Sequence, residues 1–126
     1  MKNKLLVLLA AFTLCISCSD DGDALPQNAA CDVDNPVEDL DWLRTLVDTI
    51  KSNESSVAKS FYIQMATFDN APIFLQNNCC AVCNTVVPIY NCQGESLGFL
   101  GGEIKQADLS DERIIFERDD SNCFQD

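Results

Sequence analysis

The segment NNCCAVCN, residues 77–84, constrains the fold more than any other stretch because it places Cys79, Cys80 and Cys83 within five positions. Such spacing is typical of a redox-active dithiol, of a metal site or of structural disulfides. Adjacent α-carbons lie about 3.8 Å apart, which is less than the roughly 4.4 Å that an unstrained disulfide needs. Cys79 and Cys80 are therefore not expected to bond to each other. In an extended segment they point to opposite faces and would reach two different elements.

The first 17 residues have the features of a secretory signal peptide. Two lysines precede an apolar run, residues 5–14, which is too short to cross a bilayer because a spanning helix needs about 20 residues. Ser17 and Cys18 resemble the bacterial lipobox, in which a small residue precedes the cysteine that becomes lipidated, although Cys15 stands where a leucine is usual. We expect a signal peptide over residues 1–17 and a lipid on Cys18, which would attach the chain to a membrane. Ordinary secretion is the alternative.

Residues 18–30 are expected to form a flexible tether. Its start, SDDGD, resembles the acidic segment that follows the lipidated cysteine in lipoproteins of the Bacteroidota, and this resemblance implies export to the cell surface. Leu25 is the only large apolar residue of the tether, so the tether has little to bury. Residues 31–126 then remain as one small domain.

The charge balance is strongly acidic. The formal net charge of the chain is −12, with 20 acidic and 8 basic residues. Binding of nucleic acid is not expected, because no basic patch is available to replace the counterions of the phosphates. The acidic residues are interpreted mainly as a solvated surface.

The stretch from Asn35 to Ser56 predicts the main helix. Asn35 is a candidate N-cap, Pro36 suits the first helical position, and Glu38 stands where a capping box has its carboxylate. Asp39 or Asp41 could equally cap a second start, which would separate the first turn from the main helix. One apolar stripe is formed at spacings of three and four by Leu40, Leu43, Leu46 or Val47, and Ile50.

The pattern then changes to alternation and predicts strands. Phe61, Ile63 and Met65 share one face of the first strand, and Asp69-Asn70 predicts a tight turn into the second. Strands are expected over residues 60–68, 71–76, 85–92 and 96–104, with a bend at Gly101-Gly102. Residues 110–118 are compatible with a strand or a helix. The predicted fold class is α+β, with an N-terminal helix packed on a small antiparallel β-meander and stabilised by disulfides.

The predicted domain contains six cysteines outside the cytoplasm, and we interpret them as a disulfide framework. Cys31 and Cys123 lie near its two ends and are candidates for long-range bridges. A redox site at Cys80 and Cys83 remains open, although no helix is predicted to start there and lower the thiol pKa. A zinc site is a further alternative. The disulfide candidates are Cys31, Cys79, Cys80, Cys83, Cys92 and Cys123, and the zinc alternative would use Cys79, Cys80, Cys83 and Cys92.

The chain contains no histidine, and this excludes Ser-His-Asp and Cys-His catalysis. DVDNPVED superficially resembles a calcium loop but lacks its sixth-position glycine, and GFLGG lacks the lysine of a phosphate loop. We therefore predict no catalytic residue, no metal site and no cofactor.

Two stretches together resemble a family of small lipoproteins of the Bacteroidota. They are NPVEDLDWL, residues 35–43, and the stretch from APIFLQNNCC to VPIYNCQGESLGFLGG, residues 71–102. Relatives tend to have proline at the position of Asp41, and some carry a further cysteine at the position of Gly98. The resemblance implies no known activity and no site residues.

These patterns favour a non-enzymatic, lipid-anchored binding module at the outer membrane or cell surface, with a protein, peptide or glycan partner. Trp42, Tyr62 and Tyr90 form a candidate binding face, although aromatic residues at such positions are more often part of the core. One alternative is an envelope thiol-disulfide protein that uses Cys80 and Cys83. Another is an envelope protease inhibitor, which would carry an exposed rigid loop between cysteines.

Overall fold

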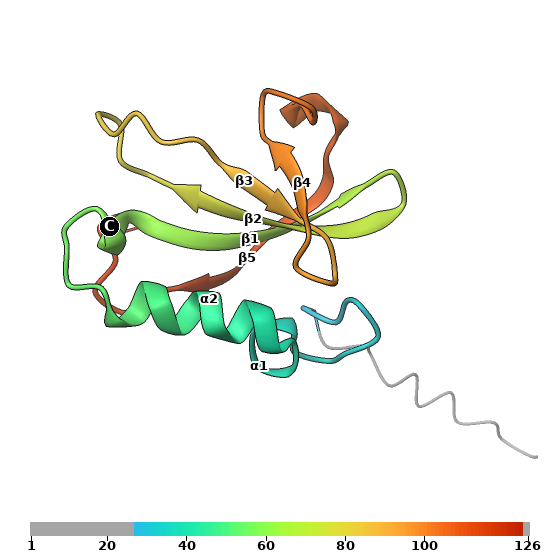
Figure 1. Ribbon diagram of the computed structural model, residues 1–126, viewed down its shortest axis with the longest axis horizontal. Coiled ribbons are helices and arrows are strands. Elements are labelled where there is room, and N and C mark those ends of the chain that lie inside the picture. Colours follow the sequence, from blue (N-terminus) through green and yellow to red (C-terminus); the bar gives the residue numbers. More distant parts are fainter. Residues whose placement is uncertain (1–26, 125–126) are drawn as a thin grey trace, which may run out of the picture.

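The computed structural model of the chain describes residues 27–124. The predicted signal peptide, the lipidation site Cys18 and most of the tether lie outside the described residues. The described part forms two short helices packed on one face of a five-stranded sheet (Figure 1). In chain order the elements are α1 (Pro36–Asp39), α2 (Asp41–Ser52), η1 (Ala58–Ser60), β1 (Phe61–Phe68), β2 (Ala71–Asn78), β3 (Pro88–Tyr90), β4 (Ser96–Phe99), η2 (Gln106–Asp108) and β5 (Ser110–Glu117).

The helical region is divided at Leu40, whose backbone is extended. A separate second helix start is therefore confirmed, but its N-cap is Leu40 rather than Asp39 or Asp41, and the capping box with Glu38 is wrong. The Asn35 side chain makes no capping hydrogen bond, and its backbone N–H instead donates to Asp39 Oδ2 at 3.0 Å. The predicted apolar stripe lies on α2, where the buried residues are Leu43, Val47 and Ile50.

The sheet is antiparallel throughout, and its strand order is β4-β3-β2-β1-β5. Strands β1 to β4 form the predicted meander, with the β1–β2 turn at Asp69 and Asn70, both of which have positive φ. Residues 110–117 form a strand rather than a helix, and this strand returns to pair with β1 at the opposite edge. The third strand is shorter than predicted, because residues 79–87 form a loop before Pro88. The predicted bend occurs at Gly101, with φ 90°.

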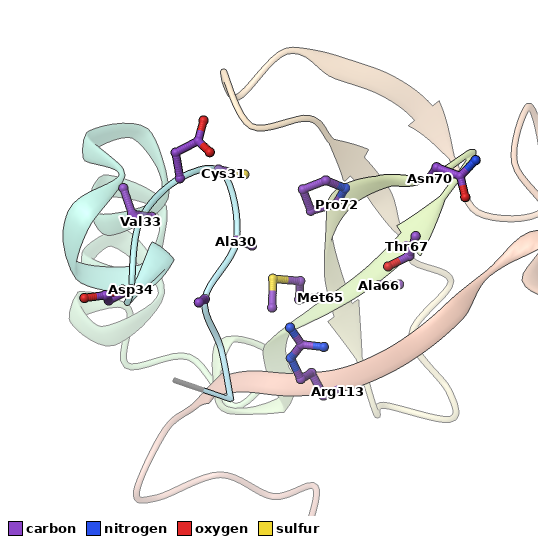
Figure 2. Close-up of a pocket in the computed structure, with 12 residues that line it drawn as sticks. Ala30, Cys31, Val33, Asp34, Met65, Ala66, Thr67, Asn70, Pro72 and Arg113 are labelled. Atoms are coloured by element: carbon purple, nitrogen blue, oxygen red, sulfur yellow. The ribbon is translucent and has the colours of Figure 1, made fainter. Parts of the chain in front are cut away.

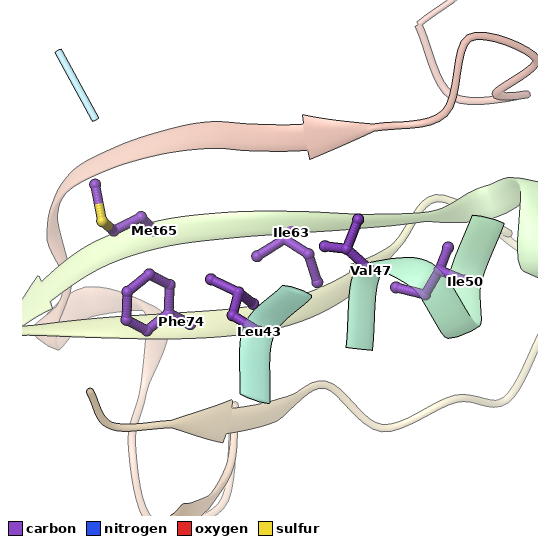
Figure 3. Packing of buried hydrophobic residues seen from close by; sticks show 6 residues of the cluster. All are labelled: Leu43, Val47, Ile50, Ile63, Met65 and Phe74. Atoms are coloured by element: carbon purple, nitrogen blue, oxygen red, sulfur yellow. The ribbon is translucent and has the colours of Figure 1, made fainter. Parts of the chain in front are cut away.

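Both faces of the sheet bury apolar side chains, because β1 and β2 alternate between two core clusters. Figure 3 shows the first cluster, in which α2 packs on β1 and β2. The second is covered by the connection from β4 to β5, which includes Ile104 and Leu109. Full burial of one large aliphatic or aromatic side chain contributes about 1.5–3 kcal/mol. The buried members are Leu43, Val47, Ile50, Ile63, Met65 and Phe74 in the first cluster, and Ala66, Ile73, Leu75, Ile89 and Ile104 in the second.

Trp42 closes the first cluster against the turn that follows β3. Its ring makes an edge contact with Phe74, with ring centroids 5.6 Å apart, and its Nε1–H donates to the Cys92 carbonyl at 2.9 Å. Gly94 lies directly against this ring with φ 78°, and a Cβ there would come within 2.7 Å of Trp42. The turn can therefore approach the helix so closely only with glycine at this position.

We predict that Gly94→Ala destabilises the protein more than Gly101→Ala. Both glycines have positive φ, at 78° and 90°, but a Cβ at position 101 meets nothing within 4 Å. Because the second substitution carries only backbone strain, the difference in free energy of unfolding should be about 1–3 kcal/mol, as for overpacking. Urea denaturation followed by the fluorescence of Trp42, the single tryptophan, measures this difference. Equal losses in the two variants would contradict the close packing of Trp42 on the turn.

Candidate functional site

One end of the molecule is held together by a disulfide and main-chain hydrogen bonds. We call it the cystine end and define it as residues 53–60, 79–87 and 118–124. Cys79 bonds to Cys123, and the Cys79 N–H donates to the Ser60 carbonyl at 3.0 Å. The Asn122 N–H donates to the Lys59 carbonyl, also at 3.0 Å. Three segments that are distant in sequence thus meet beside the C-terminus (Figure 1).

The Cys80–Cys83 disulfide closes a short loop within this end. The expectation that Cys79 and Cys80 do not bond to each other is confirmed, and Cys79 does reach a distant segment. The expectation that Cys80 also reaches another element is wrong, because the chain turns immediately after Cys80 and brings Cys83 back to it. This turn carries hydrogen bonds from the Cys80 N–H to Asn78 Oδ1 at 2.6 Å and from the Cys83 N–H to the Cys80 carbonyl at 3.3 Å.

The third disulfide, Cys31–Cys92, lies at the other end of the molecule and joins the N-terminal segment to the end of β3. Cys31 and Cys123 are both long-range partners, as predicted, but they do not bond to each other. In the chain-entropy model, the two bridges with sequence separations of 61 and 44 contribute about 4 kcal/mol each. The bridge with a separation of 3 contributes less than about 2 kcal/mol.

The disulfides bear on the chemistry that the sequence left open. The zinc alternative needs four thiolates from Cys79, Cys80, Cys83 and Cys92, whereas all four sulfurs are bonded in three different disulfides. Among residues 27–124, no group of three or more cysteine or acidic side chains is arranged to hold a metal ion. No helix begins at Cys80, so a helix dipole does not act on its sulfur.

The cystine end exposes large apolar side chains. Val82, between Cys80 and Cys83, is 95 % exposed, and Val86 is 63 % exposed. Phe124, the residue after Cys123, stacks edge-on against Tyr62 with ring centroids 5.2 Å apart. Apolar groups on a braced loop have little conformational freedom left to lose on binding, which favours association.

The predicted aromatic face is divided between the two faces of the sheet. Trp42 and Tyr90 lie together on the helix side, with ring centroids 5.6 Å apart. Tyr62 belongs to the opposite face and contacts Phe124 of the cystine end. Its pKa is raised by burial and by the nearby negative charge of Glu112. The hypothesis of a single face formed by Trp42, Tyr62 and Tyr90 is therefore wrong.

Arg118 ties the cystine end to the C-terminus of α2. Its Nη1 group donates to the carbonyls of Ile50 at 2.7 Å, Lys51 at 3.0 Å and Asn53 at 2.8 Å. These carbonyls belong to the last turn and the C-cap of α2, where the negative end of the helix dipole lies. The guanidinium also forms an ion pair with Asp120. The Nζ of Lys59 lies 2.9 Å from Asp120 Oδ2 and forms a second ion pair with the same carboxylate.

Comparison of the chain with models of protein families, with curated proteins and with solved structures finds no match. The resemblance to lipoproteins of the Bacteroidota therefore stays a prediction. Within residues 27–124, no helix has the length and apolar character needed to cross a membrane.

We predict that Asp120→Asn makes the free energy of unfolding less dependent on pH in acid. Hydrogen bonds from Arg118 and Lys59 hold the pKa of Asp120 well below its usual range. A carboxyl group with a depressed folded-state pKa stabilises the fold above its unfolded pKa, about 3.9, and this contribution is lost as the pH falls through the folded pKa. The free energy of unfolding, measured by urea denaturation between pH 5 and pH 2, should therefore decline less steeply below about pH 4 in the variant than in the wild type.

Asp119→Asn is the matched control, because it removes one negative charge from the exposed neighbouring position. If Asp119→Asn and Asp120→Asn change the acid limb equally, the ion pair is not the cause of the effect.

Proposed function

We propose that the chain is a lipid-anchored, non-enzymatic binding module of the outer membrane or cell surface, which binds a protein partner at the cystine end. The observation that carries this proposal is the loop of residues 79–87. Two disulfides brace it, and yet it exposes Val82 and Val86. Exposed apolar side chains on a braced loop are candidates for contact with a partner, because apolar surface patches often mark interaction sites.

The position of the first described residues supports the same proposal. The first described residues, blue in Figure 1, lie at the end of the molecule opposite the C-terminus and the cystine end. A lipid on Cys18 would therefore be attached through the tether to the far end. The braced loop would point away from the membrane, toward partners outside it.

A protease inhibitor is the second candidate, and the same loop supports it. An inhibitor of this kind needs a rigid exposed loop with a side chain that enters the substrate pocket of the protease. Val82 stands out from a loop closed by Cys80–Cys83 and held by Cys79–Cys123. The redox alternative has less support, because no helix start activates Cys80.

We predict that a photoreactive side chain at position 82 cross-links to one defined protein in the cells that produce this chain. The control carries the same group at position 99, because Phe99 is also exposed, at 45 %, but lies on β4, outside the cystine end. A discrete adduct at position 82 that is absent at position 99, and that Val86→Asp weakens, is the expected result. Mass spectrometry then identifies the cross-linked protein. If that protein is a protease, the result favours the inhibitor function over the general binding module.

The same experiment in a Cys18→Ala background tests the lipid anchor. The unlipidated chain should leave the membrane fraction, and the position-82 adduct should decrease if the partner lies at the membrane. Equal adducts at positions 82 and 99, or none at either, would contradict binding at the cystine end. Retention of Cys18→Ala in the membrane fraction would contradict the lipid anchor alone.

A further inference from the structure

A cavity of about 610 Å³ lies at the end of the molecule opposite the cystine end. The N-terminal arm, residues 27–34, forms one wall, and the β1–β2 hairpin forms the other (Figure 2). Most of the residues that line it are small or apolar, and its charged lining residues are Asp32, Asp34 and Arg113.

The arm that forms this wall is fixed in place. Cys31 and Asp32 have φ of 57° and 63°, and the turn they make is closed by hydrogen bonds of 3.0 and 3.1 Å between Ala30 and Val33. The Cys31–Cys92 disulfide attaches this turn to the end of β3. The cavity is therefore formed before any ligand arrives, which lowers the entropy lost on binding.

Arg113 is the cationic group of the cavity. It lies directly across from Met65 in the β1–β5 pairing, between two register shifts that give β5 an additional residue on each side. Bulges of this kind redirect side chains. Figure 2 shows the guanidinium rising from β5 toward Met65, whereas Asp34 is directed away from it.

The guanidinium of Arg113 has few hydrogen-bond partners among the described residues. Its Nε is buried and has no hydrogen-bond partner among residues 27–124. The Nη1 group makes one long hydrogen bond, 3.4 Å, to the Asp111 carbonyl, and no carboxylate of the described residues forms an ion pair with Arg113. The other two arginines that the structure describes, Arg44 and Arg118, both have carboxylate partners. Because Nε has almost no accessible surface, a ligand in the cavity would reach Arg113 through its Nη groups, for which no described carboxylate competes.

We propose that this cavity binds a monocarboxylate with a short apolar chain. The carboxylate accepts hydrogen bonds from Arg113, because guanidinium and carboxylate match in geometry and can pair through two parallel bonds. The apolar chain lies along Met65 and Pro72. The strong negative charge of the protein, −12, disfavours polyanions, so one carboxylate with an apolar body fits better than a phosphate.

This site is independent of the cystine end, so its failure would leave the proposed function untouched. Two sources supply the same chemistry: a free aliphatic acid and the C-terminus of a peptide with small side chains. The probes are hexanoate and acetyl-Ala-Ala-Ala with a free C-terminus. Each has its uncharged amide as matched control, and inorganic phosphate is the anion control.

The experiment is an NMR titration of the ¹⁵N-labelled full domain. It follows the Arg113 Nε–H signal and the backbone amides of Ala66 and Thr67. We expect saturable shifts of these signals with at least one of the two carboxylates, and at least tenfold weaker binding of its amide. Hexanoate alone identifies an aliphatic acid as the ligand class, and the peptide alone identifies a C-terminus.

Arg113→Met should lower the affinity for the carboxylate that binds at least tenfold. Arg44→Met, at an exposed arginine of α2, should leave that affinity unchanged. The wild-type Nε–H shift keeps the test valid even if Arg113→Met does not fold. The proposal is overturned if neither carboxylate shifts these signals, if amides or phosphate bind as tightly, or if folded Arg113→Met binds like the wild type.

Discussion

Two long-range disulfides hold the N-terminal arm and the C-terminal segment against the sheet. The hydrophobic core is small, so it contributes less to fixing these segments. Cys31–Cys92 fixes the N-terminal arm beside the β3–β4 turn, and Cys79–Cys123 fixes the C-terminus beside the end of β2. A domain of about 100 residues buries a modest share of its unfolded surface, so restriction of the unfolded chain is a large part of its stability. The disulfides thus prearrange both ends of the sheet as well as stabilising the fold.

The cystine end and the opposite end of the molecule differ in chemistry. The cystine end exposes the apolar side chains of Val82, Val86 and Phe124, and Val82 stands on a doubly braced loop. The opposite end is concave and places the partly unsatisfied guanidinium of Arg113 at the base of a cavity. A chain tethered through its N-terminus would keep the cavity near the tether and direct the braced loop outward. The two proposed sites, a partner surface and a small-ligand cavity, would therefore lie at opposite ends of one small domain.

Local signals in the sequence predicted much of the fold. The spacing of Leu43, Val47 and Ile50 placed α2, and Asp69-Asn70 placed the turn between β1 and β2. Short-range geometry also excluded a Cys79–Cys80 bond, but it could not choose among partners because pairing depends on tertiary contacts. The long-range features were missed for the same reason. No local sequence pattern indicates that β5 pairs with β1. The same holds for the register shifts that direct Arg113 toward the cavity. Val82 escaped notice because a single apolar residue between cysteines is uninformative.

The six cysteines of the described residues are structural and join in one specific pattern, on which both ends of the molecule depend. Cys79 and Cys80 are adjacent and stay in one peptide after proteolysis, so stepwise partial reduction with alkylation, followed by mass spectrometry of the peptides, is the direct measurement. We predict only the pairs Cys31–Cys92, Cys79–Cys123 and Cys80–Cys83, with no free thiol among the six before reduction. Free Cys80 and Cys83 in the native protein, or a bridge from Cys80 to Cys123 or Cys31, would contradict it.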